Sequence, residues 1–370
     1  MGSGLVAIGT ALCTVAWALL LAGLGPCRAA AASCDLGQVA GGVDIAVSSV
    51  NGDVIVVAQG LRVLRSTDGG SSYSDRWIGV EGSWPSVAFR GSNLFVAAGR
   101  WGEPDEIFLL HSIDGGISFA EPRLVYASAA NELIDPELLA LRDGALMVFA
   151  TEILGQSGDR VEFTIHVFRS DDDGWTWQRL ADAVAGSPAP PTIEDAKAVE
   201  LANGDLLLAY EAEAVELGGS RLEQIRSRDG GLSWGPPAVL WDDVPGSDNE
   251  PGGYLQRAPD ELWFLASTDE DAVEGYSNAV VKRKISTDGG ATWHGKATLV
   301  GEPDQIVFGG ALTPAGMIMM VTVRQFSTPP RHLNVYHADP RAPGLWACAP
   351  PLFIDGFEDG SSGRWTAAVP

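Results

Sequence analysis

STDGGATW, residues 286–293, is the cleanest copy of a stretch that this chain repeats. The pattern is Ser-x-Asp-x-Gly-x-x-aromatic, and we call each copy an octet. The aspartate of the octet lies, in chain order, at Asp68, Asp114, Asp172, Asp229 and Asp288. Successive aspartates are 46, 58, 57 and 59 residues apart. A period of this size predicts an array of equal supersecondary units.

Each octet is expected to form a tight turn between two β-strands. An apolar run precedes each copy, as residues 107–110 precede Ser112. Ser and Asp side chains hold turns by bonding nearby backbone N–H groups, and glycine supplies the positive φ that the turn needs. The aspartate run at 171–173 lacks the spacing and the closing glutamate of an EF-hand. The octets therefore predict architecture rather than catalysis.

The octet resembles the Asp box, also called the BNR repeat, of the sialidase (neuraminidase) superfamily. The resemblance covers most of the chain that follows the apolar N-terminus. It implies an all-β fold, a six-bladed β-propeller of four-stranded antiparallel blades. Asp boxes occur in sialidases, in other glycosidases and in receptors without enzymatic activity. They therefore leave the chemistry of this chain open.

The strand pattern agrees with six blades. Short apolar or alternating runs bounded by Gly, Pro and Asp predict four strands around each octet. The first unit is expected at 43–50, 54–58, 61–65 and 77–80. A sixth unit follows the last octet, with strands at 306–312, 317–323 and 333–337. Its own octet is degenerate, because Trp346 follows Asp339 by seven residues rather than five. Six such units make a propeller.

The charge of the chain narrows its partners. It has 24 Lys and Arg against 48 Asp and Glu, a net charge of −24. A surface this acidic argues against nucleic acid and against an anionic membrane surface. The partners we expect are a carbohydrate or another extracellular ligand, bound by a monomer.

The N-terminal residues are expected to direct export from a bacterial cell. Residues 5–24 are almost wholly apolar, and cleavage after Ala32 would satisfy an Ala-x-Ala pattern. A retained anchor and a lipoprotein stay open as alternatives. The expected division is a signal peptide or anchor at 1–32, a propeller at 33–350 and a tail at 351–370. The location is periplasmic, cell-surface or secreted.

Two features lie at the ends of the mature chain. Cys34 and Cys348 would suit a disulfide in an oxidising compartment, and a ring-shaped fold would bring them together. The alternative is two unpaired thiols. The tail around 353–365 is similar to a short C-terminal pattern on exported proteins of some Gram-negative bacteria. It is read either as a tag for the outer membrane or cell surface or as a disordered tail.

Sialidase motifs are incomplete in this sequence. The resemblance implies an arginine in the opening strand, yet residues 41–46 hold none. A second arginine is expected where Glu211 stands, and a nucleophilic tyrosine is expected where Phe308 stands. The glutamate that the family places before blade four has a counterpart in Glu194 or Asp195. A carboxylate in place of a guanidinium would repel the carboxylate of sialic acid.

Candidate site residues lie in the loops that are expected on the face opposite the octets. The catalytic candidates are Glu194, Asp195, Glu211 and Arg324, and the ligand-binding candidates are Arg100, Asp135, Tyr276 and Arg331. Trp84 and Trp101 could stack on sugar rings or serve packing.

The sequence identifies no certain cofactor, and the metal content of this face is left undetermined, with Ca²⁺ as a candidate. Glu211 and Glu213, two apart on an extended strand, could bind Ca²⁺, work as acid and base, or form a solvated acidic rim.

Three functions are compatible with the sequence. The first is an exported glycan- or ligand-binding module with an incomplete sialidase set. The second is a glycoside hydrolase, either an exo-sialidase or an enzyme that uses a pair of carboxylates. The third is a surface-structural protein whose tail provides targeting.

Overall fold

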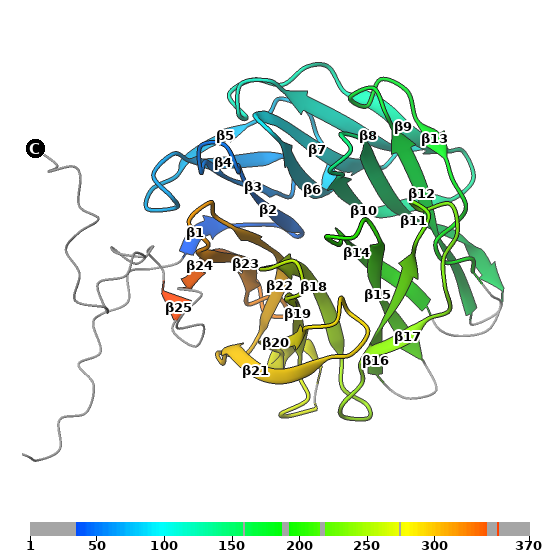
Figure 1. Ribbon diagram of the computed structural model, residues 1–370, viewed down its shortest axis with the longest axis vertical. Helices are drawn as coiled ribbons and strands as arrows, with labels where there is room; N and C mark the ends of the chain where they lie inside the picture. The colour runs from blue at the N-terminus through cyan, green and yellow to red at the C-terminus, as the bar shows by residue number, and fades with distance from the viewer. Residues whose placement is uncertain are drawn as a thin grey trace, which may run out of the picture. The chain divides into compact units, whose positions relative to one another are not determined.

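The computed structural model describes residues 35–157, 160–186, 192–214, 219–273, 275–338 and 346–347. Six antiparallel sheets form a ring, so the chain folds as the predicted six-bladed β-propeller (Figure 1). One short 3-10 helix, η1 (Tyr276–Asn278), interrupts the all-β structure in its described part. Within these residues, no helix has the length and apolar character needed to cross a bilayer.

The first three blades follow the chain in order. Blade 1 contains β2 (Val43–Val47), β3 (Val54–Ala58), β4 (Arg62–Ser66) and β5 (Ser74–Trp77). Blade 2 contains β6 (Ser83–Arg90), β7 (Asn93–Arg100), β8 (Asp105–Ser112) and β9 (Arg123–Ser128). Blade 3 contains β10 (Glu132–Ala140), β11 (Leu146–Ser157), β12 (Arg160–Ser170) and β13 (Gln178–Arg179).

The last three blades complete the ring. Blade 4 contains β14 (Thr192–Glu200), β15 (Leu206–Ala214), β16 (Gly219–Ser227) and β17 (Ala238–Trp241). Blade 5 contains β18 (Asn249–Gln256), β19 (Leu262–Thr268), β20 (Val280–Ser286) and β21 (His294–Val300). Blade 6 contains β22 (Gln305–Leu312), β23 (Ile318–Arg324), β24 (His332–Ala338), β25 (Trp346–Ala347) and β1 (Asp35–Gln38).

Strand β1 closes the ring, a role that the sequence pattern did not reveal. It comes from the N-terminal end of the described chain and pairs with β24 of blade 6, with Asp35 opposite Asn334. Strand β25 pairs with β24 at His337, so the two ends of the propeller share one strand. The predicted disulfide partners, Cys34 and Cys348, lie outside the described residues, as do the apolar N-terminus and the tail.

The hydrophobic core lies between the blades. Each cluster of buried side chains joins the facing sides of two neighbouring sheets, as Val56 of blade 1 and Val321 of blade 6 do. The first strand of each blade contacts the first strands of both neighbours, so these six strands surround the axis. This arrangement explains why the second strand of every blade is so apolar: it is covered on both faces.

The octets form the turns between third and fourth strands, and all five share one hydrogen-bond pattern. In the last copy, Ser286 Oγ donates to Asp288 Oδ1 at 2.7 Å and accepts from Gly290 N at 2.8 Å. Asp288 then accepts from the backbone N and the hydroxyl of Thr292, at 2.9 and 2.5 Å. The bonds from Thr292 are the main cause that lowers the pKa of Asp288 to about 2. The octet is thus a self-contained turn.

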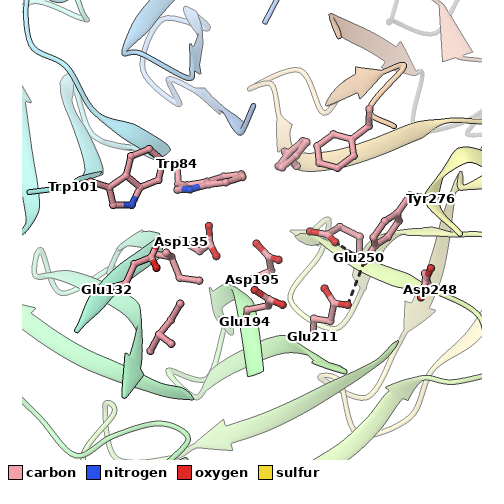
Figure 2. A pocket seen from close by; sticks show the side chains of 14 residues that line it. Trp84, Trp101, Glu132, Asp135, Glu194, Asp195, Glu211, Asp248, Glu250 and Tyr276 are labelled. Atoms are coloured by element: carbon pink, nitrogen blue, oxygen red, sulfur yellow. Dashed lines mark hydrogen bonds between the residues drawn. The ribbon is translucent and has the colours of Figure 1, made fainter. Parts of the chain in front are cut away.

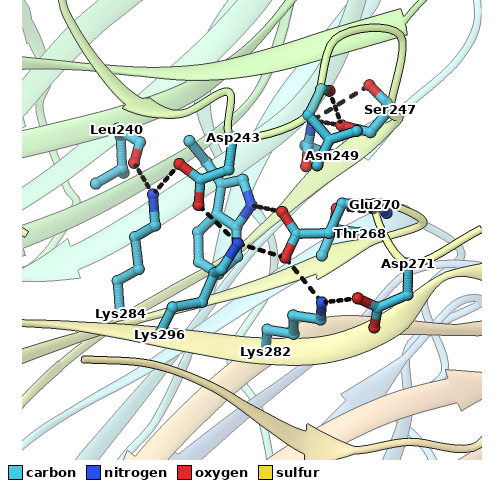
Figure 3. Close-up of polar contacts among 12 residues, drawn as sticks. Leu240, Asp243, Ser247, Asn249, Thr268, Glu270, Asp271, Lys282, Lys284 and Lys296 are labelled. Carbon is cyan, nitrogen blue, oxygen red and sulfur yellow. Dashed lines mark hydrogen bonds and ion pairs between the residues drawn. The ribbon is translucent and has the colours of Figure 1, made fainter. Parts of the chain in front are cut away.

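A buried ion-pair network fastens blade 4 to blade 5 (Figure 3). Glu270, whose side chain is 2% exposed, lies 2.8 Å from Lys282 Nζ and 2.9 Å from Lys296 Nζ. Asp243 lies 2.9 Å from Lys284 Nζ and 3.0 Å from Lys296 Nζ. Lys284 also donates to the carbonyl of Leu240, on the last strand of blade 4. The network therefore bridges two neighbouring sheets, which also meet through apolar clusters and separate hydrogen bonds.

Candidate functional site

A pocket of about 490 Å³ lies on the face opposite the octets. Its residues come from the beginnings of first strands, the ends of second strands and the loops that follow. Because neighbouring strands are antiparallel, these ends are at the opposite edge of each blade from the octets. The lining consists of seven carboxylates, one tyrosine, two tryptophans, two phenylalanines and two isoleucines, with Glu132, Glu194, Glu211, Asp248 and Tyr276 among them. The rest of its polar wall consists of Asp135, Asp195 and Glu250.

Three carboxylates reach the pocket from equivalent places in neighbouring blades. Asp135, Asp195 and Glu250 lie near the beginnings of β10, β14 and β18. The register of β10 and of β14 shifts at the aspartate, which adopts a φ of 47° in Asp135 and 53° in Asp195. A bulge of this kind redirects a side chain that regular pairing would place otherwise. In Figure 2, Asp195 lies between Asp135 and Glu250.

The carboxylates crowd into two overlapping trios. Asp135, Glu194 and Asp195 have oxygens within 4.8 Å of one another, and so do Asp195, Glu211 and Glu250. Asp195 belongs to both trios. An oxygen set of this kind suits a hard cation such as Ca²⁺. It also suits proton transfer, because carboxylates this close cannot all ionise.

Burial and mutual repulsion change the acidity of this set. Burial, then the charges of Asp195 and Glu194, raises the pKa of Asp135 well above its usual range. Burial, then the charges of Asp195 and Glu211, does the same for the pKa of Glu250. The hydrogen bond between Glu250 and Asp195 raises the pKa of Glu250 and lowers that of Asp195. Glu250 is therefore the proton donor of this pair, and Asp195 the acceptor.

Tyr276 joins the second trio from the loop after β19. Its hydroxyl donates to Glu211 Oε1 and to Glu250 Oε2, each at 3.3 Å (Figure 2). Burial, followed by the charges of Glu250 and Glu211, raises the pKa of this hydroxyl. Asp269 fixes the loop by accepting from Gly275 N at 2.8 Å. Tyr276 thus remains a neutral donor and is a poor nucleophile.

A layer of polar residues closes the axis below the pocket. Each blade contributes the first-strand residue at the same register, which gives Asp44, Ser86, Glu137, Lys197, Gly253 and Gly309. Ser86 Oγ donates to Asp44 Oδ2 at 3.1 Å, and Lys197 Nζ lies 3.8 Å from Glu137 Oε2. The glycines leave room for this layer, because a Cβ on Gly309 would lie 2.4 Å from Asp44 Oδ1.

Lys197 supplies the positive charge closest to the pocket carboxylates. Burial alone would lower the pKa of Lys197, but Glu137, Asp44 and Asp195 outweigh it and raise the pKa. Burial raises the pKa of Asp195 overall, and the charge of Lys197 offsets part of this rise. Burial raises the pKa of Glu137 to about 7 in the same layer. Lys197 therefore favours the ionised form of Asp195, between two carboxyls that hold protons.

Aromatic side chains form the other wall. Trp84 and Trp101 come from blade 2, and Phe308 and Phe326 come from blade 6. Arg331 positions Phe326, because its Nε donates to the Phe326 carbonyl and its guanidinium lies 4.4 Å from the ring centroid. The pocket thus faces a ligand with carboxyl groups on one side and flat apolar rings on the other.

The structure brings together five of the eight candidates from the sequence. Asp135, Glu194, Asp195, Glu211 and Tyr276 line the pocket. The three arginines do not line it.

The arginines have other partners or positions. Arg100 pairs with Glu106 at 3.0 Å, and Arg331 donates to the carbonyls of Phe326 and Ala40. Arg324 ends β23 opposite His332. No guanidinium therefore lines the pocket in the described part of the chain, and the sialidase requirement for arginine is unmet there.

Sequence reasoning missed the importance of Glu250 and Lys197. Both lie in first strands, where Glu250 precedes Pro251 and Lys197 follows a bulge. Their alternation with apolar residues was visible, but the bulge that sets which side chains face the axis was not. Glu213, the other member of the predicted carboxylate pair, has its side chain outside the described set.

Comparison with known proteins finds solved structures of similar fold at low sequence identity. No protein-family model matches the chain, and no curated protein sequence matches it. A protein of unknown function from Dyadobacter fermentans is 13% identical, with a TM-score of 0.62, over 80% of this chain and 93% of that one. A Hadza microbial sialidase is 17% identical, with a TM-score of 0.56, over 80% of this chain and 64% of the sialidase.

A Penicillium chrysogenum alpha-L-arabinanase, solved with arabinobiose, is also similar. It is 13% identical, with a TM-score of 0.56, over 80% of this chain and 92% of the arabinanase. Identities this low establish similarity of fold only. The chain is therefore a sialidase-like six-bladed β-propeller, an architecture that it shares in outline with propeller glycosidases.

Proposed function

We propose that this protein is a glycoside hydrolase that acts on uncharged glycans through a pair of carboxyl groups. The observation that carries the proposal is the Asp195–Glu250 pair, two hydrogen-bonded carboxyl groups inside a pocket with an aromatic wall, of which Glu250 has its pKa raised well above the usual range. Glycoside hydrolysis needs one carboxyl that gives a proton and another that is charged. The aromatic side chains suit the apolar faces of sugar rings.

Each group has a role that follows from its position. Glu250 protonates the glycosidic oxygen as the bond to the anomeric carbon breaks, and Asp195 stabilises the positive charge that develops on the sugar. A water molecule then adds to the anomeric carbon and gives a proton back to Glu250. Lys197 favours the ionised form of Asp195, and Tyr276 orients Glu250 by its hydrogen bond. Asp135, whose raised pKa keeps it protonated, donates to a sugar hydroxyl. A sialic acid is disfavoured, because its carboxylate would meet carboxylates.

The experiment is a panel of 4-nitrophenyl glycosides of neutral sugars, run beside a fluorogenic sialoside. We expect release of nitrophenol from at least one neutral glycoside and little turnover of the sialoside. The change Glu250→Gln removes the acid, so kcat should fall by about 10²–10⁴-fold. The matched control is Glu121→Gln, an exposed carboxylate just beyond an octet, which should leave kcat unchanged.

Two outcomes would contradict the proposal. Robust sialoside hydrolysis would show that the missing guanidinium is supplied in another way. Binding of neutral glycans without turnover, measured by calorimetry, would assign the pocket to a binding module instead. The aromatic wall of the pocket also supports this second function, because flat rings stack on sugars whether or not the sugar is then hydrolysed.

A further inference from the structure

A second pocket, of about 450 Å³, continues the first one outward over blades 2 and 3. Trp101 and Glu132 line both pockets, so the two are contiguous. In Figure 2, Trp101 and Glu132 lie on the side of Trp84, away from Tyr276. We call the second space the outer pocket. A ligand that fills the axial pocket can therefore extend past Trp101 into the outer pocket.

Trp101 has the position of a stacking platform. Its side chain is 52% exposed, although large aromatic side chains usually bury most of their surface. The backbone around it is held firmly, because Arg100 pairs with Glu106 at 3.0 Å and Gly102 N donates to Asp105 Oδ1 at 2.7 Å. An exposed ring on a fixed backbone loses little conformational entropy when a ligand covers it.

The opposite wall of the outer pocket is also held in place. Ser128 Oγ and Asn131 Nδ2 both donate to Glu152 Oε1, at 2.7 and 2.9 Å. Glu152 is buried, and its other oxygen lies 2.5 Å from His166 Nε2. This buried group anchors the loop between β9 and β10. The outer pocket is therefore preformed on both sides.

The chemistry of the outer pocket matches that of the axial pocket. Its polar side chains include Glu103, Asp105, Asn131 and Glu132, and none of the described residues that line it is Lys, Arg or His. Carboxylate and amide oxygens accept hydrogen bonds from hydroxyl groups, while the ring of Trp101 covers an apolar face. An anionic sugar would be repelled here as well.

We propose that the outer pocket is a second sugar subsite, so that the protein takes a neutral oligosaccharide rather than a single sugar. This inference rests on the proposed function for the chemical class of the ligand only, because the subsite needs binding and not hydrolysis. The first unit occupies the axial pocket, and the next unit stacks on Trp101. Trp101 then decides the preference for chain length.

The test measures binding by calorimetry with arabino-, xylo-, cello- and galacto-oligosaccharides of two to six units and with the corresponding methyl glycosides. We expect at least one series to bind more tightly than its monosaccharide. The variant Trp101→Ala should reduce the ratio of oligosaccharide to monosaccharide affinity about tenfold, and Trp101→Phe should restore most of it. Trp77→Ala removes an equally exposed ring, 57% exposed on blade 1, and should leave the ratio unchanged.

Several results would overturn the subsite. They are equal affinity for single sugars and oligosaccharides, absence of binding across the whole panel, or equal effects of Trp101→Ala and Trp77→Ala. Thermal melting of each variant separates loss of binding from loss of fold. If oligosaccharides bind through Trp101 but no glycoside is hydrolysed, the subsite stands and the proposed hydrolysis fails.

Discussion

At the scale of single residues, the octets show how much of a turn three residues can specify. The serine, the aspartate and the glycine at the fifth position form the same bonds in all five copies. The glycine also packs against the preceding blade, because a Cβ on Gly290 would lie 2.5 Å from Leu207 Cδ1. The octet therefore determines both the turn and the distance between two blades.

The change Gly290→Ala should destabilise the propeller. The backbone φ of Gly290 is 82°, which L-residues rarely adopt, and the added methyl meets a side chain buried in the core. We expect the free energy of unfolding to fall by about 1–3 kcal/mol. Urea unfolding measures this, with Gly60→Ala as the control. Gly60 also has a positive φ, of 78°, but has nothing within 4 Å of its Cβ. Equal losses in the two variants would show that packing against Leu207 contributes nothing.

The ionisation of Asp135 should lower the stability of the folded protein at neutral and higher pH. Its pKa is raised in the folded state, so the unfolded chain ionises first as the pH rises, and stability falls above the usual value of 3.8. Asp135→Asn removes this charge and keeps a side chain that tolerates a positive φ. The variant should melt at a higher temperature than the wild type near pH 8, and the gap should narrow as the solution is acidified. A gap that is independent of pH would contradict the raised pKa.

At the scale of elements, the first strands of the blades carry most of the carboxylates that line the pocket. Five of the six carry a register shift near the axis. The bulge turns Asp135 and Asp195 into the pocket and leaves Glu137 and Lys197 in the layer below it. In a strand, a shift of one residue moves every later side chain to the other face. The same residues with regular pairing would not form this site.

The ion-pair network between blades 4 and 5 should be strongly coupled to folding. Glu270→Gln leaves Lys282, whose side chain is 6% exposed, with less compensation for its charge. We expect a loss of about 3–5 kcal/mol in the free energy of unfolding. Asp75→Asn breaks an exposed pair with Arg62 and should cost no more than about 1 kcal/mol. The losses are measured by denaturant titration. Similar losses in the two variants would show that the network contributes no more to the free energy of unfolding than an exposed ion pair does.

At the scale of the whole molecule, the fold depends on a strand from one end of the chain completing the blade at the other end. Strands β1 and β25 pair with the same edge of β24, at Asn334 and His337 (Figure 1). Closing the ring in this way ties the two ends of the propeller together by hydrogen bonds within one blade.

The predicted disulfide between Cys34 and Cys348 belongs to this scale and stays a prediction. Their described neighbours, Asp35 and Ala347, lie in β1 and β25. We expect protein made in an oxidising compartment to resist thiol alkylation until it is reduced. Cys348→Ser should lower the free energy of unfolding by about 2–5 kcal/mol. Alkylation of both thiols without a reductant, measured by mass spectrometry, would contradict the pairing.

The limits of prediction follow from how far apart the contributing residues lie. Glu211 and Tyr276 were predicted near a ligand because the sequence pattern placed each in a loop at the expected end of its own blade, although Glu211 lies within β15. Glu250 gained its role only from neighbours in other blades, Asp195 and Tyr276. Arg324 lies at the predicted end of β23, yet Phe326, two residues later, lines the pocket in its place.

By itself, the sequence determined the number of blades, the position of their turns and the all-β class, because each of these is encoded within one contiguous unit. It also indicated an acidic mouth without the sialidase arginines. Only the tertiary structure decided that Asp195 lies between two carboxyls whose pKa values are raised well above the usual range, with Lys197 beneath it. That arrangement depends on bulges and on the packing of separate blades around one axis, and the acidity of a carboxyl depends on those neighbours in space.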